Sequence, residues 1–274
     1  MDKYGLIGHP LGHSMSPLIH KRLFALSGIT DYSYELIDIP PEELAANETM
    51  LREMKGFNIT IPHKTAVIPM TDKLGESALR YNSVNCISNC GGVMTGYNTD
   101  CDGFIRSAEL LPLSGKVLLI GCGGVGRMIA IEAALHGAEL TIAVIPQDVK
   151  TAQLAMAEIL SKCGDVSVKI CLISEIEGQF DLLINATPVG MFPKTDACPV
   201  SGQVIENCLS CFDVIYNPKE TLLMKKFRDL GKTAVGGAAM LVWQAVKAHE
   251  LWYGGEFNIS DISAIVTEVE NAVK

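Results

Sequence analysis

Residues 117–126, VLLIGCGGVG, decide the fold of this 274-residue chain. Four apolar residues run into a turn with four glycines, and Arg127-Met-Ile-Ala-Ile-Glu-Ala-Ala-Leu continues at helical spacing. This order predicts a buried parallel strand, a tight turn and a helix. Gly121, Gly123 and Gly126 fit the pattern G-x-G-x-x-G, in which the backbone approaches a pyrophosphate and a helix N-terminus offers it unpaired N–H groups. A glycine-rich turn without a ligand is the alternative, but the flanking strand and helix favour a dinucleotide site.

The composition is that of a globular protein. Hydrophobic residues make up 48% and charged residues 19% of the chain, and its length suits two packed α/β units. Apolar runs stop well short of a membrane span and no signal peptide is recognisable, so we expect a cytoplasmic protein without a membrane partner. The net charge of −9 argues against nucleic-acid binding, because phosphate contacts need a basic face.

The nine cysteines form no pattern typical of a metal site or a disulfide framework. Cys208-Leu-Ser-Cys211 is a lone C-x-x-C motif without nearby histidines. We therefore expect reduced, mostly buried thiols and no bound metal.

Strand-like and helix-like segments alternate along the chain, which predicts parallel sheets. The expected strands are 3–8, 32–39, 56–62, 84–88, 93–97, 117–120, 139–145, 166–173, 181–186, 211–216 and 233–235. Helices are expected to begin at Ser16, as a cap followed by Pro17, and at residue 40, and to cover 76–81, 103–111, 149–162, 222–230, 240–253 and 262–273. Residues 89–92, Asn-Cys-Gly-Gly, predict the turn of a β-hairpin.

Polar side chains gather at the ends of the strands expected in the first half. They are Ser14, Ser16, Thr60, Lys64, Asn85 and Asp100. Because open α/β sheets bind ligands outside the carboxyl ends of their strands, we expect these side chains to converge on one crevice. Taken singly, each has an ordinary explanation as a helix cap, a turn residue or a solvated charge.

Together these segments resemble the shikimate dehydrogenase family in order and spacing, over essentially the whole chain. The motifs that carry the resemblance are residues 8–17, 57–64, 83–85, 96–100, 120–125, 185–191, 213–218 and 240–245. The resemblance implies an oxidoreductase of aromatic amino-acid (chorismate) biosynthesis, which interconverts 3-dehydroshikimate and shikimate by hydride transfer with NADP(H).

The resemblance also implies that Lys64 and Asp100 form a catalytic pair beside the reacting C3 oxygen. Hydride addition to a ketone leaves an oxyanion, which a positioned ammonium stabilises and protonates. We therefore expect Lys64 to carry the proton and Asp100 to orient it, and the reversed assignment stays open. The substrate-binding residues that the family match implies are Ser14, Ser16, Thr60, Asn85, Tyr216 and Gln244, whose hydroxyls and amides suit a carboxylate and ring hydroxyls.

On the cofactor side, the match implies contacts with the pyrophosphate and with the nicotinamide. The residues are Gly121, Cys122, Gly123, Gly124 and Val125 for the pyrophosphate, and Thr187, Val214, Gly237 and Met240 for the nicotinamide end.

One segment departs from the family pattern. NADP-dependent members typically follow the second strand of this half with Asn-Arg-Thr, whose arginine meets the 2′-phosphate. Here residues 143–148 read AVIPQD, with Ile145 near the arginine position, and Asp148 is suited to accept a hydrogen bond from a ribose 2′-hydroxyl. NADP(H) is the cofactor implied by the resemblance, NAD(H) is the alternative, and Lys150 is the first basic residue that can reach a phosphate.

Pattern and resemblance together predict an α/β fold of two domains with the active site in the cleft between them. Residues 1–102 would form a substrate-binding domain and residues 103–236 a Rossmann-like dinucleotide-binding domain, with helices of 237–274 packing back on the first. An NAD-dependent quinate/shikimate dehydrogenase and a non-catalytic dinucleotide-binding paralogue stay open, whereas the motifs at 98–100 and 240–244 disfavour a methylenetetrahydrofolate-type dehydrogenase. The sequence allows a monomer or a homodimer.

Overall fold

The computed structural model describes residues 1–12 and 14–273, and His13 of the first motif lies outside them. The chain divides into two compact units. Unit 1 comprises Met1–Gly103 and Val242–Val269, and unit 2 comprises Phe104–Leu241 and the residues from Glu270 onward. Residues 237–241 thus group with unit 2, where the Gly237 N–H donates to the Ile215 carbonyl at 3.0 Å.

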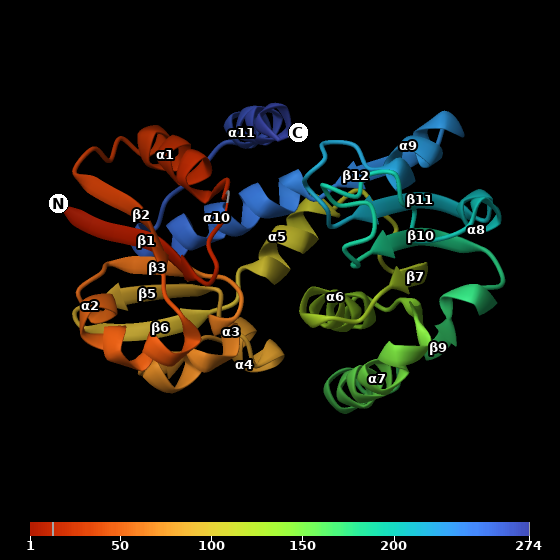
Figure 1. The fold of residues 1–274 in the computed structure, drawn as a ribbon, viewed down its shortest axis with the longest axis horizontal. Coiled ribbons are helices and arrows are strands. Elements are labelled where there is room, and N and C mark those ends of the chain that lie inside the picture. Colours follow the sequence, from red (N-terminus) through yellow and green to blue (C-terminus); the bar gives the residue numbers. More distant parts are fainter. Residues whose placement is uncertain (13, 274) are drawn as a thin grey trace. The chain divides into compact units, whose positions relative to one another are not determined.

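Unit 1 is built on a six-stranded sheet of order β2-β1-β3-β5-β6-β4 (Figure 1). Its strands are β1 (Asp2–Gly8), β2 (Tyr32–Asp38), β3 (Gly56–Ile59), β4 (Lys73–Leu74), β5 (Cys86–Cys90) and β6 (Val93–Tyr97). Its helices are α1 (Ser16–Leu26), α2 (Glu48–Arg52), α3 (His63–Ala66) and α4 (Glu76–Tyr81), with 3-10 turns η1 (Pro41–Glu43), η2 (Ala45–Asn47) and η3 (Ile68–Met70). Three helices run across the unit boundaries: α5 (Asp100–Ser107), α10 (Ala238–Tyr253) and α11 (Ile259–Ala272).

The sheet of unit 1 is mixed. The alternation of strands and helices predicted parallel sheets, and the hairpin predicted at residues 89–92 adds an antiparallel pair. Strand β1 pairs in parallel with β2 and β3, but β5 is antiparallel to both β3 and β6. The reason is the predicted hairpin, in which Gly91 and Gly92 adopt φ values of +61° and +86° and reverse the chain within two residues.

The two faces of this sheet have separate cores, because side chains alternate along a strand. Ile7, Phe57, Ile87 and Met94 point to one face, where they pack with apolar residues of the α2–α4 region. On the other face the ring of Tyr4 lies 5.0 Å from Phe24 of α1 and 4.8 Å from Trp252 of α10. The second core therefore joins the first strand to the C-terminal helices.

Several helix starts differ from the sequence prediction. Helices α5, α10 and α11 begin two or three residues earlier than expected, at Asp100, Ala238 and Ile259. Ser16 is the first residue of α1 and not its cap; the cap position is Met15, and the Ser14 hydroxyl accepts from the Ser16 N–H at 3.2 Å. The helix expected at residue 40 is instead the two 3-10 turns η1 and η2 followed by the short α2.

Unit 2 contains an all-parallel sheet of order β12-β11-β10-β7-β8-β9. Its strands are β7 (Lys116–Ile120), β8 (Glu139–Val144), β9 (Val168–Leu172), β10 (Phe180–Asn185), β11 (Cys208–Asp213) and β12 (Thr233–Gly236). Its helices are α6 (Gly124–Leu135), α7 (Val149–Cys163), α8 (Gly202–Glu206) and α9 (Leu222–Asp229), with turns η4 (Pro146–Asp148) and η5 (Ile173–Glu175). This strand order is that of a doubly wound dinucleotide-binding fold, and the order reverses between β7 and β10.

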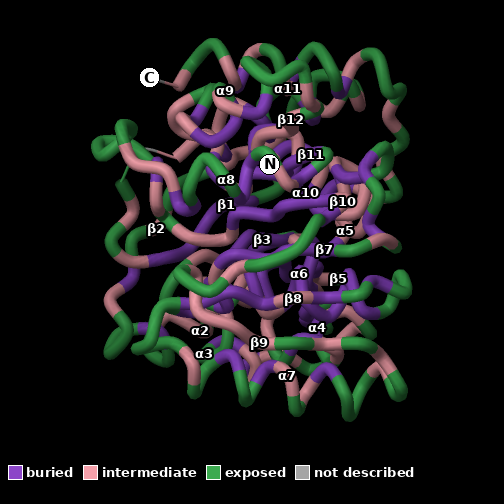
Figure 2. The backbone as a smooth tube through the Cα atoms, turned by 90° about the vertical axis from the view of Figure 1, so that its right-hand side faces the viewer, coloured by how far each residue is buried: buried purple, intermediate pink, exposed green. Residues whose placement is uncertain are grey.

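Helices cover both faces of the parallel sheet. Figure 1 shows α6 and α7 beside each other, and both contact β8, whereas α8 and α9 contact β11. The central strands β7, β10 and β11 are largely buried. In Figure 2 much of α7 is exposed, in keeping with an amphipathic helix that buries only Ala152, Ala155 and Ile159. Within the described residues, none of the helices combines the length and the apolar composition that crossing a bilayer requires.

Two histidines are buried in unit 1 without a counter-charge. His20 of α1 and His249 of α10 are 0% exposed, and His20 Nδ1 lies 2.8 Å from His249 Nε2. The Tyr253 hydroxyl contacts His249 Nδ1, and the His20 ring stacks on Tyr34 at 4.2 Å. Burial lowers the pKa of His20 to about 3, and burial together with His20 lowers the pKa of His249 well below its usual value. Both rings are therefore neutral in the folded protein at neutral pH.

We predict acid sensitivity from this pair. Below pH 6.5 the unfolded chain protonates both histidines while the folded chain does not, so the free energy of unfolding falls as the pH falls. From pH 6.5 to pH 5, His20 alone accounts for about 2 kcal/mol, and chemical denaturation across that range measures it. H20F should flatten this pH dependence, whereas H136A, at the exposed end of α6, should not. An unchanged slope in H20F would contradict the prediction.

Candidate active site

The sheet of unit 1 brings the predicted polar residues to one edge. Strands β1 and β3 are parallel, so their carboxyl ends lie side by side, and β6 ends at the same edge because Tyr97 pairs with Cys86 at the start of β5. The segments that follow these strands carry Thr60, Lys64 and Asp100. Their convergence follows from strand direction.

Lys64 and Asp100 form an ion pair at this edge. Lys64 lies on α3, directly after the turn that ends β3, and its Nζ donates to Asp100 Oδ2 at 2.6 Å. The two side chains are 26% and 18% exposed, so the pair is shielded and still open to a ligand. Asp100 is the first residue of α5, where a helix N-terminus favours a carboxylate.

Asn85 fixes the second oxygen of this carboxylate. Its Nδ2 donates to Asp100 Oδ1 at 2.8 Å, and its Oδ1 accepts from the Thr99 N–H at 2.6 Å. The Thr99 hydroxyl lies 3.2 Å from Asn85 Oδ1 and 3.3 Å from Gln244 Oε1 on α10. Asn85, Thr99 and Gln244 are each less than 10% exposed. The predicted residues Lys64, Asp100, Asn85 and Gln244 thus belong to one hydrogen-bonded network.

Ser14 and Ser16 are joined to the same strand ends through residues that the sequence did not single out. The Tyr34 hydroxyl is hydrogen-bonded to the Ser16 side chain and donates to Asn58 Oδ1 on β3 at 3.0 Å. Ser14 uses its oxygen as an acceptor for the Ser16 N–H, which leaves the proton of its hydroxyl for an acceptor elsewhere. The one sequence feature that pointed to these contacts is the polar residue Asn58 in the otherwise apolar strand β3, which is fully buried.

The glycine turn of unit 2 has the geometry of a phosphate cradle. Gly121 has φ +86°, and a Cβ there would lie 2.6 Å from Thr187 Cγ2. A Cβ on Gly126 would lie 2.5 Å from the Gly121 carbonyl oxygen, so only glycine lets the start of α6 approach the turn this closely. A Cβ on Gly123 or Gly124 would meet nothing within 4 Å, so these backbone positions face open space at the start of the 12-residue α6. The chain's own residues therefore fit a dinucleotide pyrophosphate.

The two non-glycine residues of the turn, Cys122 and Val125, differ in burial. Cys122 is 4% exposed, and burial raises the pKa of its thiol to about 11, so only its backbone suits ligand contact. Val125 is half-buried on α6.

The backbone of unit 2 places predicted nicotinamide residues in two separate groups. Thr187 follows β10 and packs on Gly121, and a Cβ on Gly237 would collide with the Val214 carbonyl. Met240 is 7% exposed on α10, and Tyr216 follows β11, where burial raises the pKa of its phenol. Unit 2 therefore collects Gly121 and Thr187, and separately Val214 and Gly237, at the carboxyl ends of β7, β10 and β11.

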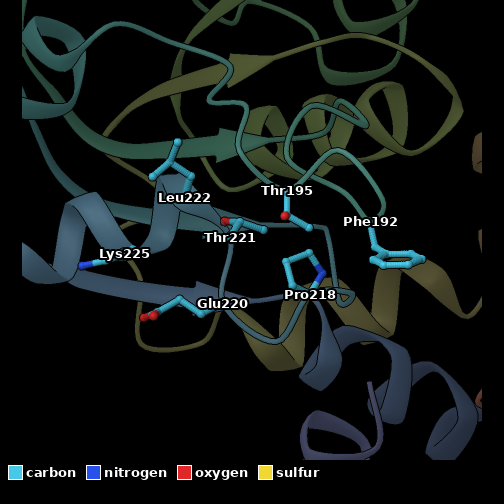
Figure 3. A pocket seen from close by; sticks show the side chains of 7 residues that line it. All are labelled: Phe192, Thr195, Pro218, Glu220, Thr221, Leu222 and Lys225. Carbon is cyan, nitrogen blue, oxygen red and sulfur yellow. The ribbon is translucent and has the colours of Figure 1, made fainter. Parts of the chain in front are cut away.

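A pocket of about 390 Å³ lies beside these loops in unit 2 (Figure 3). It is lined by Phe192, Thr195, Pro218, Glu220, Thr221, Leu222 and Lys225. None of these residues was predicted to bind substrate or cofactor, and the pocket is distinct from the glycine turn.

Comparison with known proteins identifies the family of this chain. A family model described as the shikimate dehydrogenase substrate binding domain matches residues 6–87. A curated relative from Caldanaerobacter subterraneus, shikimate dehydrogenase (NADP(+)), is 37% identical over 262 residues, which cover 93% of this chain and 92% of the relative.

The chain belongs to the shikimate dehydrogenase family.

Solved structures of this family share the fold over almost the full length. A shikimate dehydrogenase in complex with NADP+ is 32% identical with a TM-score of 0.89, covering 97% of this chain and 95% of that one. Shikimate 5-dehydrogenase from Listeria monocytogenes, in complex with shikimate and NAD, is 29% identical with a TM-score of 0.86, covering 97% and 96%.

The departure from the family pattern after β8 is visible in the structure. Ile145 is 48% exposed at the end of β8, and Asp148 and Lys150 are exposed on η4 and the first turn of α7. Arg127 on α6 donates to both oxygens of Glu158 at 2.6 and 2.7 Å, so its charge is already paired. An aliphatic side chain cannot neutralise a phosphate, which leaves Lys150 as the cation on this segment.

We predict that Asn85 holds the network. N85A leaves the buried Thr99 N–H without its acceptor and Asp100 without one donor, and we expect a loss of about 1–3 kcal/mol in the free energy of unfolding. Urea denaturation measures the change. N47A is the control, because Asn47 makes one exposed bond to the Glu43 carbonyl. Equal stability of N85A and wild type would refute the role assigned to Asn85.

Proposed function

We propose that this protein interconverts 3-dehydroshikimate and shikimate by hydride transfer with NADP(H). The observation that carries the proposal is the shielded Lys64–Asp100 pair at the carboxyl edge of the unit 1 sheet. Its support comes from the curated relative, whose name states both the activity and NADP(+). Unit 1 would bind the substrate and unit 2 the dinucleotide, in a cytoplasmic enzyme.

Lys64 is the proton carrier in this proposal. Both oxygens of Asp100 are occupied, one by Lys64 Nζ and the other by Asn85 Nδ2, so the carboxylate acts as an acceptor that orients the ammonium. An ammonium has three donors, so after its bond to Asp100 Lys64 has two more N–H groups to offer a ketone oxygen. In reduction it would stabilise the developing oxyanion and donate the proton; in oxidation it would accept the proton from the hydroxyl.

The remaining polar residues suit a polyhydroxylated carboxylic acid. Ser14 and Tyr216 would supply hydroxyl donors for the carboxylate, and Ser16 would do so by exchanging its bond to Tyr34. Thr60, Asn85 and Gln244 would supply donors and acceptors for ring hydroxyls. Asn85 would also hold the catalytic pair, because its amide already bonds to Asp100.

The dinucleotide would lie on the glycine turn of unit 2. Gly121, Gly123 and Gly124 let the backbone approach the pyrophosphate, and Cys122 and Val125 line the turn. Thr187, Val214, Gly237 and Met240 would flank the nicotinamide, which supplies or accepts the hydride when bound.

K64A tests the catalytic assignment. Loss of the ammonium should lower kcat by at least about 100-fold, the contribution typical of a positioned acid or base. The free energy of unfolding should change by less than about 1 kcal/mol, because the pair is partly exposed. Absorbance of the reduced nicotinamide during shikimate oxidation measures turnover, and K55A, an exposed lysine before β3, is the control. Near-normal turnover by K64A would overturn the assignment.

K150A tests the cofactor assignment. If Lys150 pairs with the 2′-phosphate, its removal should lower kcat/KM for NADP+ by about tenfold, because a charge-assisted hydrogen bond contributes about 1.5–3 kcal/mol. The value for NAD+ should stay unchanged, and so should both values in K169A, an exposed lysine on β9. Wild-type turnover with NAD+ that matches or exceeds turnover with NADP+ would favour the NAD-dependent alternative, for which Ile145 and Asp148 are the structural argument.

A further inference from the structure

Asp213 is a buried carboxylate that the proposed reaction does not use. It ends β11, is 0% exposed, and accepts three hydrogen bonds. The Thr221 hydroxyl donates to Oδ2 at 2.7 Å, whereas Asn185 Nδ2 and the Ile215 N–H donate to Oδ1 at 3.0 and 3.1 Å. These donors come from the last residue of β10 and from the segment that follows β11.

The bond to Asn185 extends to Thr187. Asn185 ends β10, and its Oδ1 accepts from the Thr187 N–H at 3.1 Å and from the Thr187 hydroxyl at 2.7 Å. The Thr187 oxygen in turn accepts from the Val189 N–H at 3.2 Å. The orientation of the Asn185 amide therefore determines the first turn of the loop after β10.

The bonds to Ile215 and Thr221 fix the second loop. Ile215 follows Val214 directly, and the Thr221 hydroxyl also caps α9 by accepting from the Met224 N–H at 3.2 Å. The loops are joined further by two backbone bonds, from Val214 N to the Asn185 carbonyl and from Phe192 N to the Asn217 carbonyl, each 3.0 Å. One carboxylate thus connects both loops at their bases.

We infer that Asp213 is a positioning residue for the nicotinamide end of the dinucleotide site, acting through Asn185 on Thr187 and through Ile215 on Val214. This inference rests on the proposed function, in which Thr187 and Val214 flank the nicotinamide.

Burying a carboxylate costs free energy that an apolar side chain of similar size would not cost at this position. Removing an ionised group from water costs several kcal/mol unless donors replace its hydration. Burial raises the pKa of Asp213 to about 6 although its three donors oppose the shift. Here Oδ1 accepts donors from both loops and Oδ2 accepts the Thr221 hydroxyl, whereas an apolar residue would leave all three donors buried without partners.

Calorimetric binding of two probes tests the inference. NADP+ carries the nicotinamide, and 2′-phospho-ADP-ribose lacks it but keeps the pyrophosphate and the adenosine phosphate. In D213L we expect the Kd for NADP+ to rise at least fivefold and kcat for shikimate oxidation to fall at least tenfold, while the Kd for 2′-phospho-ADP-ribose changes less than twofold. D213N, which keeps Oδ1, should recover most of both losses.

Each other outcome counts against the inference. Equal weakening of both probes would mean that Asp213 supports the whole unit, and unchanged Kd and kcat would mean that it positions nothing. If D213L does not fold, the same measurements on T221V decide, with the same selective loss expected at smaller size and T221S as its control. Failure of wild-type turnover overturns the proposed function and leaves the binding comparison valid. Failure of the wild type to bind NADP+ overturns the inference as well.

Discussion

The hydrogen bond from Asn85 to Asp100 is the interaction on which the rest of the unit 1 site depends. It fixes the carboxylate that orients Lys64, and the same amide holds Thr99 and, through its hydroxyl, Gln244 of α10. The site therefore spans residues from three parts of the sequence, joined by an amide that is 3% exposed. A buried amide of this kind is fully satisfied only when its neighbours adopt one arrangement, so the network specifies geometry as well as contributing stability.

Sequence reasoning succeeded where chemistry is local. The glycine turn at 121–126 lies between a strand and a helix, as predicted, because Gly121 has a positive φ and a Cβ on Gly126 would collide with the Gly121 carbonyl. The hairpin at 89–92 and the helix at 76–81 also formed as expected, since turn and helix signals there act over a few residues. The polar residues at strand ends converged because strand direction alone decides where they lie.

Sequence reasoning failed where a side chain's role depends on distant partners. Ser16 looked like a helix cap, but its hydroxyl bonds to Tyr34 on β2, 18 residues later in numbering. The strand expected at 211–216 ends at Asp213. The Asp213 carboxylate accepts a hydrogen bond from the Ile215 N–H, which is therefore not paired with a neighbouring strand. Tyr34, Asn58 and Asp213 lie on predicted strands, but the sequence predicted no role for these three side chains. Their hydrogen-bond partners are set by tertiary packing, which a single sequence does not display.

Each unit contains the same hydrogen-bonding arrangement of an asparagine, an aspartate and a threonine, and the roles proposed for the two differ. In unit 1 the Asn85 amide donates to Asp100 and accepts both the N–H and the hydroxyl of Thr99; in unit 2 Asn185 does the same with Asp213 and Thr187. The difference lies in the second carboxylate oxygen. Lys64 binds that of Asp100, which is partly exposed, whereas the Thr221 hydroxyl closes off that of Asp213. In the proposed function, a partly exposed cation makes the first arrangement suited to proton transfer, and a neutral buried donor restricts the second to holding loops in place. On that proposal, the partner of one oxygen atom separates a chemical role from a positioning role.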